Sequence, residues 1–388
     1  MKGHLRHRGE DRWSLVVDFP RKPDGRRNQK WFSFRASNRE AAEKKQVEIL
    51  HGLNTGIIGE PSDLILADYL EHWLAQYGES NLQPSTLSQY GTLIEKHINP
   101  VLGGYRLADL TAYHIQQFLR EKGRSGRLDG TGGLSASTCK TMYAILHRSL
   151  KHAVQWQLLD RNPAEPVTPP SVKRSTSIQY LEPNDVPRYL YHAREYRHYP
   201  ILFLAVHTGM RQGEILCLQW ADIEENTVRV RRSLSRTMDG EIYFGNTKTR
   251  GSRRAISISD KAVRVLGHWR TQQARERLET GELYQRSDLV FTTNTGGILN
   301  PRNVLRTHYL VLEAAGLPKT GFHALRHTHA TLLLRAGVHP KVVQERLGHS
   351  SITMTLDTYS HVIPSLQDEL AEHLDAFIEG TTRSEERL

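Results

Sequence analysis

The sequence predicts a multidomain protein with three parts: a small β-sheet plus helix module at the N-terminus, an all-α domain, and a mixed, mostly α-helical domain with a small three-stranded sheet. The chain has 388 residues, more than one ordinary domain holds. Apolar residues alternate with a period of two near the N-terminus and follow helical spacing afterwards. A proline-rich stretch then interrupts the chain. We place the domains at residues 1–60, 62–160 and 181–388, with a linker over 161–180.

The N-terminal module is predicted from its strand pattern. Apolar residues alternate over 13–19, and the aromatic run 31–34 predicts a partner strand. Ser37 and Glu40 fit a capping box, which predicts a helix to about His51. Because the module has both elements, we expect a small sheet with one helix.

A basic turn, residues 20–27, joins the two predicted strands. Aromatic strands joined by such a turn would suit a sheet that lies on DNA. The alternative is a solvated hairpin tip, since charge at a turn is ordinary. We favour DNA contact because the chain carries a formal net charge of +10, which suits a polyanionic partner.

The second domain is predicted to be helical, with a glycine-rich loop over 123–133. Its last helix has an apolar side and a basic stripe, which either grips phosphates or is a solvated face. The predicted helices span 65–77, 84–98, 111–122 and 135–157. The apolar side holds Tyr143, Leu146 and Leu150, and the basic stripe holds Lys140, His147, Arg148 and Lys151.

Four prolines between residues 161 and 180 predict an extended linker, which would let two basic domains close around a duplex. In the last domain helices dominate, and three short strands are predicted, of which the second and third would be joined through Gly245–Arg253. The strands are expected at Thr227–Ser233, Glu241–Phe244 and Ala255–Ile258.

Several classes of protein are disfavoured by composition. The most apolar stretch, Ile201–Val206, is far shorter than the roughly 20 residues of a membrane span. The N-terminus has no apolar signal segment, so we expect a cytoplasmic protein without membrane contact. Cys139 and Cys217 lie in apolar helical patterns, which favours buried free thiols over a disulfide.

Four local patterns in the last domain carry candidate chemistry. Each has a structural explanation in isolation: an arginine pairing with a nearby glutamate, a solvated lysine, a packed histidine, a helix end or a core aromatic. The patterns are Thr208-Gly209-Met210-Arg211 followed by Glu214, then Thr247-Lys248-Thr249, then His323-Ala324-Leu325-Arg326-His327, and Gly348-His349 followed by Tyr359.

Together these patterns resemble the tyrosine recombinase (phage integrase) family, in family order over about residues 180–365. Residues 62–160 resemble more loosely that family's helical core-binding (SAM-like) domain, and the first 60 resemble the arm-binding domain of lambda-type and conjugative-transposon integrases. Met210 replaces a leucine often found there. The resemblance implies a catalytic set of Arg211, Lys248, His323, Arg326 and His349, with Tyr359 as nucleophile.

The implied reaction is DNA strand transfer through a 3′-phosphotyrosine ester, without metal or ATP, to integrate or excise a mobile element. The chemistry of the residues agrees, because a hydroxyl nucleophile can store the bond energy and two guanidinium forks can bind nonbridging oxygens. His323 and Arg326 are three apart, so they share a helix face. By resemblance, His323 is the general base, Lys248 protonates the leaving 5′ oxygen, and His349 hydrogen-bonds the phosphate.

A metal site is the rival interpretation of the histidines, since His323 and His327 have i, i+4 spacing and His329 is nearby. Arg326 lies between them and would repel a metal ion, and no H-E-x-x-H pattern or cysteine cluster is present. We therefore expect no metal and no cofactor.

The resemblance also implies partners: double-stranded DNA at core-type and arm-type sites, a homotetramer on DNA, and a DNA-bending accessory protein or directionality factor. It implies a bacterial, nucleoid-associated location. A helix is predicted from Pro364 to about Ile378, which packs either on its own domain or on a neighbouring subunit.

Two other functions stay open at this point. A DNA-binding or architectural protein without catalysis would need no complete catalytic set, and a type IB topoisomerase would relax supercoils without a specific site. Among recombinases, the first 60 residues favour an integrase over a chromosome-dimer resolvase, by analogy of fold.

Overall fold

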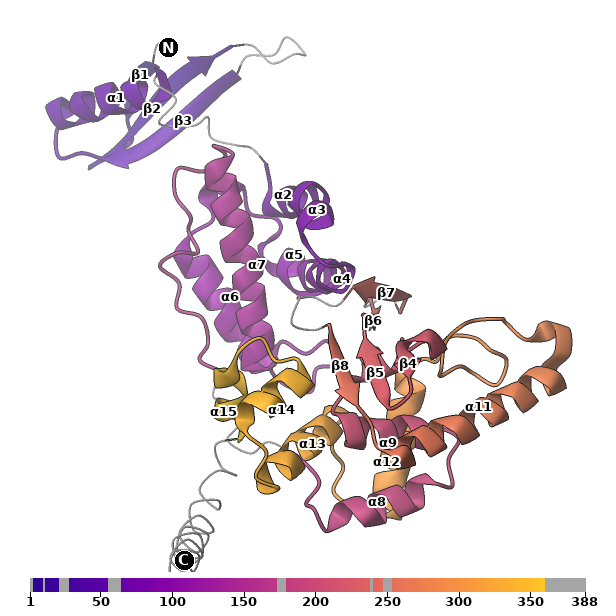
Figure 1. Cartoon of the computed structure of the whole chain (residues 1–388). Coiled ribbons are helices and arrows are strands. Elements are labelled where there is room, and N and C mark those ends of the chain that lie inside the picture. Colours follow the sequence, from indigo (N-terminus) through magenta and orange to yellow (C-terminus); the bar gives the residue numbers. More distant parts are fainter. Residues whose placement is uncertain are drawn as a thin grey trace, which may run out of the picture. The chain divides into compact units, whose positions relative to one another are not determined.

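The computed structural model describes residues 3–9, 11–20, 28–54, 64–172, 179–237, 240–246 and 253–359 (Figure 1). The chain divides into two compact units. The first comprises Met1–Arg174 together with Thr237–Asp239, and the second comprises Ser175–Arg236 and Gly240–Leu388.

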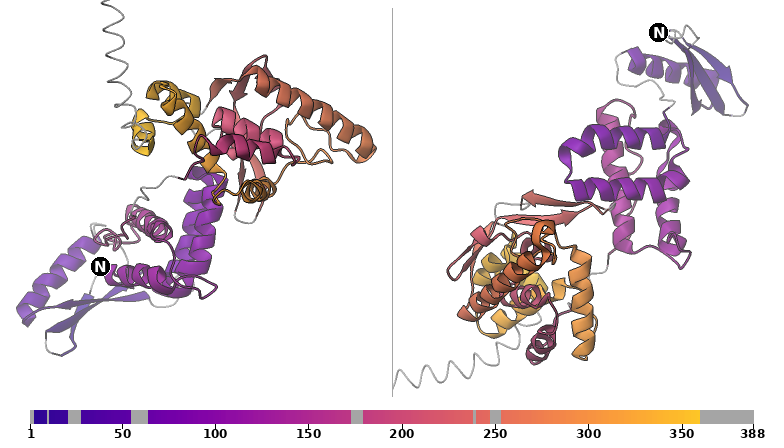
Figure 2. Two further views of the ribbon diagram at one scale, coloured as in Figure 1. Left: turned by 90° about the horizontal axis from the view of Figure 1, so that it is seen from below. Right: turned by 90° about the vertical axis from the view of Figure 1, so that its right-hand side faces the viewer.

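The N-terminal module is an antiparallel meander with one helix on one face (Figures 1 and 2). Leu15 and Val17 point to the helix side and pack with Phe19 and Ile49, as the predicted alternation requires, but Ser14 and Val16 on the other face are buried too. The first strand has no counterpart in the prediction. The elements are β1 Gly3–His7, β2 Arg12–Phe19, β3 Asn28–Arg35 and α1 Arg39–Asn54.

The predicted cap of α1 is wrong by one residue. The helix begins at Arg39, and the side chain of Asn38 accepts a hydrogen bond of 2.8 Å from the backbone N–H of Ala41. Ser37 therefore lies one residue before the cap. Most of the basic turn, residues 21–27, lies outside the described residues.

The other face of this sheet carries an exposed tryptophan with two arginines beside its ring. Trp31 is 42% exposed, and the guanidinium groups of Arg6 and Arg8 lie 5.1 and 4.9 Å from its ring centroid. On this face Arg12 of β2 also lies directly opposite Arg35 of β3 in the strand register. The result is an exposed, basic and partly aromatic surface.

The helical domain follows the predicted helices closely. Its second and fourth predicted helices contain the core residues Ile98 and Leu146, and both lie in one apolar cluster with Leu66. Thr111 and Ser135 cap α6 and α7. The elements are α2 Leu66–Trp73, η1 Leu74–Gly78, α3 Glu79–Asn81, α4 Pro84–Leu93, η2 Ile94–Ile98, α5 Asn99–Leu102, η3 Leu107–Asp109, α6 Ala112–Ser125 and α7 Ala136–Gln155.

Two details of this domain differ from the prediction. Helix α6 runs to Ser125, so the first residues of the expected loop are helical. Ala164 and Val167 are buried in the helical core, so this part of the expected linker is packed rather than extended. In α7 the basic stripe is confirmed as the exposed side, with Leu146 and Leu150 on the buried side.

The C-terminal unit is built around α9. This helix is apolar on nearly every side and packs against α8, α10, α11 and α13, as expected of a central buried helix. The helices are α8 Asp185–Ala193, α9 Tyr199–Thr208, α10 Gln212–Leu216, η4 Trp220–Asp222, α11 Asp260–Thr280, η6 Gly281–Leu283, α12 Pro301–Ala314, α13 His323–Arg335, α14 Pro340–Leu347 and α15 Ile352–Tyr359.

The strands of this unit correct the prediction. The expected strand over 227–233 is split at Arg231 into two strands that enter different sheets. One sheet has the order β4-β5-β8, and β6 pairs with β7 in a separate ribbon. The second and third predicted strands thus do not pair with each other in the described residues. The strands are β4 Ile223–Glu224, β5 Thr227–Val230, β6 Arg232–Arg236, β7 Ile242–Asn246 and β8 Arg254–Ser257.

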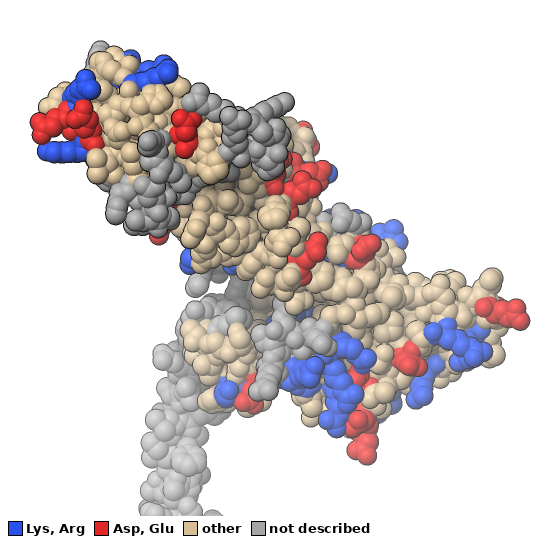
Figure 3. Space-filling model, turned by 90° about the horizontal axis from the view of Figure 1, so that it is seen from above, with Lys and Arg blue, Asp and Glu red and all other residues tan. Residues whose placement is uncertain are grey.

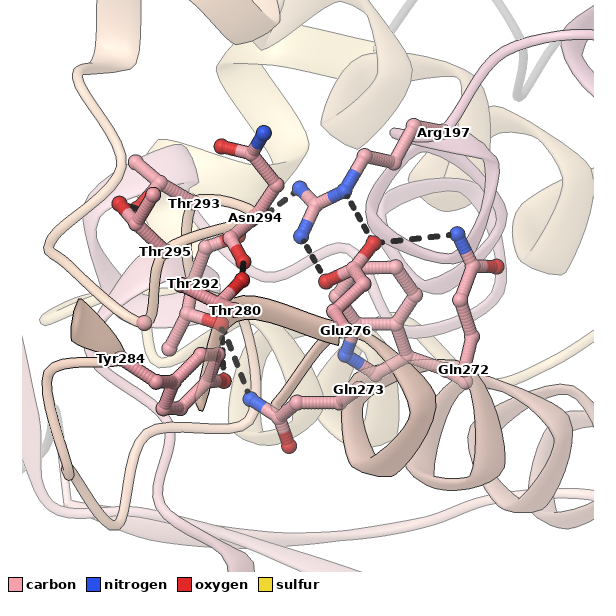
Figure 4. Close-up of polar contacts among 12 residues, drawn as sticks. Arg197, Gln272, Gln273, Glu276, Thr280, Tyr284, Thr292, Thr293, Asn294 and Thr295 are labelled. Carbon is pink, nitrogen blue, oxygen red and sulfur yellow. Dashed lines mark hydrogen bonds and ion pairs between the residues drawn. The ribbon is translucent and has the colours of Figure 1, made fainter. Parts of the chain in front are cut away.

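A network of hydrogen bonds and an ion pair holds the C-terminal half of α11 in place (Figure 4). Arg197 forms a two-pronged ion pair with Glu276, at 2.8 and 2.7 Å, and donates to the carbonyl of Thr292 at 2.9 Å. Gln273 donates to the hydroxyl of Thr292 at 3.0 Å. These contacts tie α11 to the segment before α9 and to the loop before α12.

Both cysteines are free and buried, as predicted. No helix in the described ranges has the length and apolar character needed to cross a bilayer. The predicted helix from Pro364 to Ile378 lies outside the described residues.

Candidate active site

The candidate site begins at the end of α9, where a glycine turn presents Arg211. Gly209 has φ 65°, a left-handed conformation that ends the helix. A Cβ on Gly209 would lie 2.6 Å from a side-chain carbon of Leu347 and 2.7 Å from one of His329. Glycine therefore lets the end of α9 lie directly against α13, which carries His323 and Arg326, and against α14, which precedes His349.

Arg211 is held by an acid that it shares with a second arginine. Its guanidinium donates to Glu214 at 2.8 Å, and Arg254 donates to the same carboxylate at 3.2 and 2.9 Å. Burial would raise the pKa of Glu214, but the hydrogen bonds and charges of Arg254 and Arg211 outweigh it and lower that pKa. The Arg211 side chain remains 39% exposed, so it is oriented without being hidden.

Arg326 is fixed by the ends of two helices. Its two terminal nitrogens donate to the carbonyls of Gly209 at 2.8 Å and Leu347 at 2.7 Å. These carbonyls end α9 and α14, where backbone acceptors lack helical partners. Burial, followed by the charge of Arg211, lowers the pKa of Arg326 to about 9. The side chain still carries its charge at neutral pH.

His323 and His327 lie one helical turn apart on α13, with ring centroids 4.9 Å apart. His323 lies at the start of the helix and is exposed. Surrounding protein, together with the charges of His327 and Arg326, lowers the pKa of His323 to about 4. His323 is therefore neutral at pH 7.

His349 follows the left-handed C-cap glycine of α14 and contacts the next helix. Its Nδ1 lies 2.8 Å from the hydroxyl of Thr355, which is fully buried in α15. Burial, then the charges of Arg326 and Arg211, lower the pKa of His349 to about 3. His349 is thus also neutral at pH 7.

Tyr359 ends the described part of α15 and packs in a small apolar cluster with Leu334 and Leu347. It is 1% exposed, and its hydroxyl lies 2.8 Å from Nδ1 of His327. Burial raises the pKa of the phenol, and the charge of Arg326 opposes this. Tyr359 is therefore both a core aromatic and a polar member of the site.

The charges of the site favour the binding of an anion. Among the described residues of the site, Arg211, Arg254 and Arg326 are matched by one carboxylate, that of Glu214. The histidines lose their protons because neighbouring protein reduces their hydration and the nearby charges are positive. A bound phosphodiester would offset this excess positive charge.

The structure brings together Arg211, His323, Arg326, His349 and Tyr359, all of them predicted from sequence. Lys248 lies outside the described residues. Sequence reasoning missed three partners: Arg254, Thr355 and the contact of His327 with Tyr359. These roles arise from tertiary contacts. Only Thr355 could have been found from the sequence, because it lies four residues before Tyr359 and so on the same face of a helix. In the described ranges, no group of three or more metal-ligating side chains is gathered.

Basic side chains also gather on the surface of the C-terminal unit (Figure 3). An open hollow of about 520 Å³ lies beside the sheet β4-β5-β8. Arg231 reaches it with half of its side chain exposed. Arginines from four further positions line the hollow: Arg229, Arg232, Arg253 and Arg254.

Comparison with known proteins identifies two family matches. Residues 179–365 match the phage integrase family, and residues 65–122 match the phage integrase N-terminal SAM-like domain.

Relatives and solved structures agree with these matches. A tyrosine recombinase XerC-like protein of Caldanaerobacter subterraneus subsp. tengcongensis is 30% identical, over 95% of this chain and 97% of its own. The ICEBs1 integrase of Bacillus subtilis is 26% identical, over 76% and 79%. The fold resembles the Tn1549 transposon integrase, solved with transposon right end DNA (TM-score 0.62, 21% identity, 79% and 100% covered). It also resembles lambda integrase, solved as a tetramer bound to a Holliday junction (0.56, 19%, 91% and 94%).

Proposed function

The chain belongs to the phage integrase family of tyrosine recombinases, and we propose that it cuts and rejoins DNA with Tyr359 as nucleophile, at specific sites of a mobile element. One observation carries the assignment. The Tyr359 hydroxyl lies in one cluster with three neutral histidines and with two arginines that hydrogen bonds hold in place. These are the groups that attack on a phosphodiester uses, a hydroxyl nucleophile together with cations that can bind the phosphate.

The two arginines would bind the scissile phosphate. Arg326 is fixed by two backbone carbonyls and Arg211 by Glu214, so neither has to reorganise when charge builds up on phosphorus. A preorganised donor of this kind is worth about 3–4 kcal/mol of barrier. His349 is neutral, and with Nδ1 on Thr355 its Nε2 is the ring nitrogen left for a nonbridging oxygen.

Cleavage would form a bond between the Tyr359 oxygen and phosphorus and break the bond to the 5′ oxygen. The resulting 3′-phosphotyrosine ester keeps the bond energy, so rejoining needs neither ATP nor metal. Lys248, the family's general acid by resemblance, would protonate the 5′ oxygen.

The described conformation is a resting state for this reaction. Tyr359 is 1% exposed, so its hydroxyl has to gain access to the phosphate before attack. A small shift of α15, the short helix that carries Tyr359, would open the hydroxyl to the phosphate while its contact with His327 is kept. DNA binding would supply the differential contacts that favour the shifted state.

The remaining domains would bind the target duplex. The helical domain, matched in part by the SAM-like family domain, would bind core-type DNA through the basic side of α7. The N-terminal module would bind arm-type DNA through the face that carries Trp31. The protein would hold its DNA as a tetramer, the assembly in which lambda integrase was solved on a Holliday junction. We also propose a DNA-bending or directionality partner and a nucleoid-associated location.

A nicked suicide duplex from DNA flanking the gene tests this function, with a chelator present. Wild-type protein should form a covalent protein–DNA band on a denaturing gel, and Tyr359→Phe should bind the duplex without forming it. A band with the phenylalanine variant would overturn the nucleophile. Binding without a band for either protein would favour a non-catalytic DNA-binding protein.

A type IB topoisomerase is distinguished with a plasmid that lacks the target site. The recombinase leaves its supercoils in place, whereas a topoisomerase relaxes them.

A further inference from the structure

The contact between Tyr359 and His327 assigns a role that the sequence did not predict. His327 follows Arg326 on α13, and its Nδ1 lies 2.8 Å from the Tyr359 hydroxyl, with ring centroids 5.8 Å apart. In the described residues, this is the hydrogen-bond partner of the buried phenol. A buried hydroxyl needs an acceptor for its proton, and a neutral imidazole nitrogen supplies one.

The protonation state of His327 fits an acceptor. Burial, followed by the charge of Arg326, lowers its pKa to about 4, so the ring is neutral at pH 7. With Nδ1 accepting from the phenol, the ring proton is on Nε2.

We propose that His327 is a catalytic residue whose Nδ1 orients the Tyr359 hydroxyl and takes up its proton during attack on phosphorus. The inference rests on the proposed role of Tyr359. As the O–P bond forms, the phenolic O–H bond breaks, the proton passes to Nδ1, and His327 becomes an imidazolium. The P–O5′ bond breaks, and the 5′ oxygen takes its proton from Lys248. Rejoining reverses each transfer.

The direction of proton transfer follows from how the charges change. In the free protein, a phenol would not give its proton to so weak a base. Once its oxygen bonds to phosphorus, that oxygen becomes a far weaker base, so the transfer runs downhill late in the step. The negative phosphate would also offset the positive charge of Arg326, which lowers the pKa of His327 in its absence.

This assignment separates the roles of the two histidines on α13. The hydroxyl of Tyr359 contacts His327, whereas His323 lies at the partly exposed start of the helix with its ring 4.9 Å from that of His327. His323 is thereby left to contact the phosphate, in place of the general-base role that resemblance implied.

Holding α15 in place is not the distinctive task of His327. Thr355 and Tyr359 are four residues apart, so they lie on one face of α15, and Thr355 is already anchored on His349 at 2.8 Å. A purely structural role for His327 would therefore affect stability and not the chemical step.

The same unit contains a matched pair that serves as the control. The hydroxyl of Tyr189 lies 2.7 Å from Nδ1 of His308, with centroids 5.6 Å apart, and the other ring nitrogen donates to the carbonyl of Thr320 at 3.1 Å. This tyrosine–histidine pair lies in the core between α8 and α12. It has the same chemistry and a similar geometry, and its hydrogen bonds join His308 to Tyr189 and Thr320, neither of them a catalytic candidate.

The experiment measures single-turnover cleavage of a suicide duplex that contains the gene-flanking segment protected from nuclease by the Tyr359→Phe protein. Two duplexes are compared, one with the natural linkage and one with sulfur in place of the leaving 5′ oxygen. The proteins are wild type, His327→Phe, His327→Asn, His308→Asn and Lys248→Ala. An asparagine oxygen can occupy the position of Nδ1 and accept the hydrogen bond, but it is too weak a base to take the proton. DNA affinity and melting temperature are measured for each.

His327→Phe should cleave about 10²–10³-fold more slowly than wild type, and His327→Asn should lie between them. The defect should persist with the sulfur leaving group, which needs no proton, whereas that of Lys248→Ala should largely disappear. Between pH 7 and 9 the wild-type rate should be nearly flat. The rate of both His327 variants should rise about tenfold per pH unit, because solvent must then remove the phenolic proton. His308→Asn should lower the melting temperature and leave the cleavage rate unchanged.

The proposal is overturned if His327→Phe binds DNA normally and cleaves within about threefold of wild type with a flat pH profile. If that variant does not fold, His327→Asn decides: a wild-type rate and a flat profile would contradict the assignment. Failure of the underlying function gives a different result, because wild type itself would then form no adduct that depends on Tyr359.

Discussion

Glu214 binds Arg211 at 2.8 Å while it also binds Arg254, so the residue expected to contact phosphate is oriented by a buried carboxylate. The sequence offered two explanations for Arg211, a salt bridge or a catalytic role. The geometry makes these compatible, because the pair fixes the guanidinium and leaves 39% of the side chain exposed.

Glu214→Gln should destabilise the C-terminal unit. Removing the charge breaks the buried ion pair of Glu214 with Arg254, which costs about 3–5 kcal/mol in the free energy of unfolding. Urea unfolding measures this. Glu224→Gln is the control, since Glu224 pairs with Arg229 at the same 2.8 Å on the surface and should cost under about 1 kcal/mol. Equal losses in the two variants would contradict the role of burial.

Gly209→Ala should disturb both fold and activity. Alanine is strained in the left-handed backbone of this position, and its Cβ would lie 2.6–2.7 Å from side-chain atoms of Leu347 and His329. The free energy of unfolding should therefore fall by at least about 1–2 kcal/mol. Because Arg326 binds the carbonyl of Gly209, cleavage should fall as well. Gly267→Ala, in α11 with open space around the Cβ position, should be neutral or stabilising in thermal unfolding. A stable, fully active Gly209→Ala protein would refute this account of the turn.

Acid should destabilise the protein through its buried histidines. Burial lowers the pKa of His308 to about 4, and burial followed by the charge of Arg346 lowers that of His329 to about 3. In the unfolded chain these groups titrate near 6.5, so between about pH 4 and 6.5 the unfolded state binds more protons. Their stabilisation is therefore complete above about pH 6.5 and is lost as the pH falls toward the folded values.

Going from pH 7 to pH 5 should lower the free energy of unfolding by about 1–2 kcal/mol for each such histidine. Urea unfolding at the two pH values measures the change in the free energy of unfolding. In His308→Asn this change should be smaller by the contribution of one histidine, about 1–2 kcal/mol. The same pH dependence in wild type and His308→Asn would show that His308 does not contribute.

The arginine-lined hollow should contact the DNA backbone. Arg231→Gln should weaken binding similarly on all sequences and reduce the slope of log K against log salt by about 0.9. Arg188→Gln provides a matched control, because Arg188 is 51% exposed and pairs with an aspartate, as Arg231 does at 52%. Filter binding at several salt concentrations measures both slopes, and the interpretation fails if the two variants change them equally.

Much of the fold could be predicted because its patterns are local. The capped helices of the second domain and the alternation over 13–19 depend on spacing within one element. The single strand expected over 227–233 is wrong, because the residues before and after Arg231 pair with different strands. Sheet partners alone divide it between β5 and β6.

The site shows the same limit. His323 and Arg326 could be paired by helical spacing, and Tyr359 and His349 by family order. The contact of His327 with Tyr359 joins positions 32 residues apart in the chain, and that of Arg254 with Glu214 joins positions 40 apart. No local pattern encodes such contacts, since they depend on how α13, α14, α15 and β8 pack.

Mapping the protein–DNA bond tests the central claim most directly. Trypsin should release the peptide Leu347–Arg383, in which Tyr359 is the only tyrosine, from the adduct formed on a suicide duplex. Mass spectrometry should find the 3′ end of the cut strand attached to this peptide at Tyr359. A linkage at another residue, or to the 5′ end of the DNA, would contradict the account.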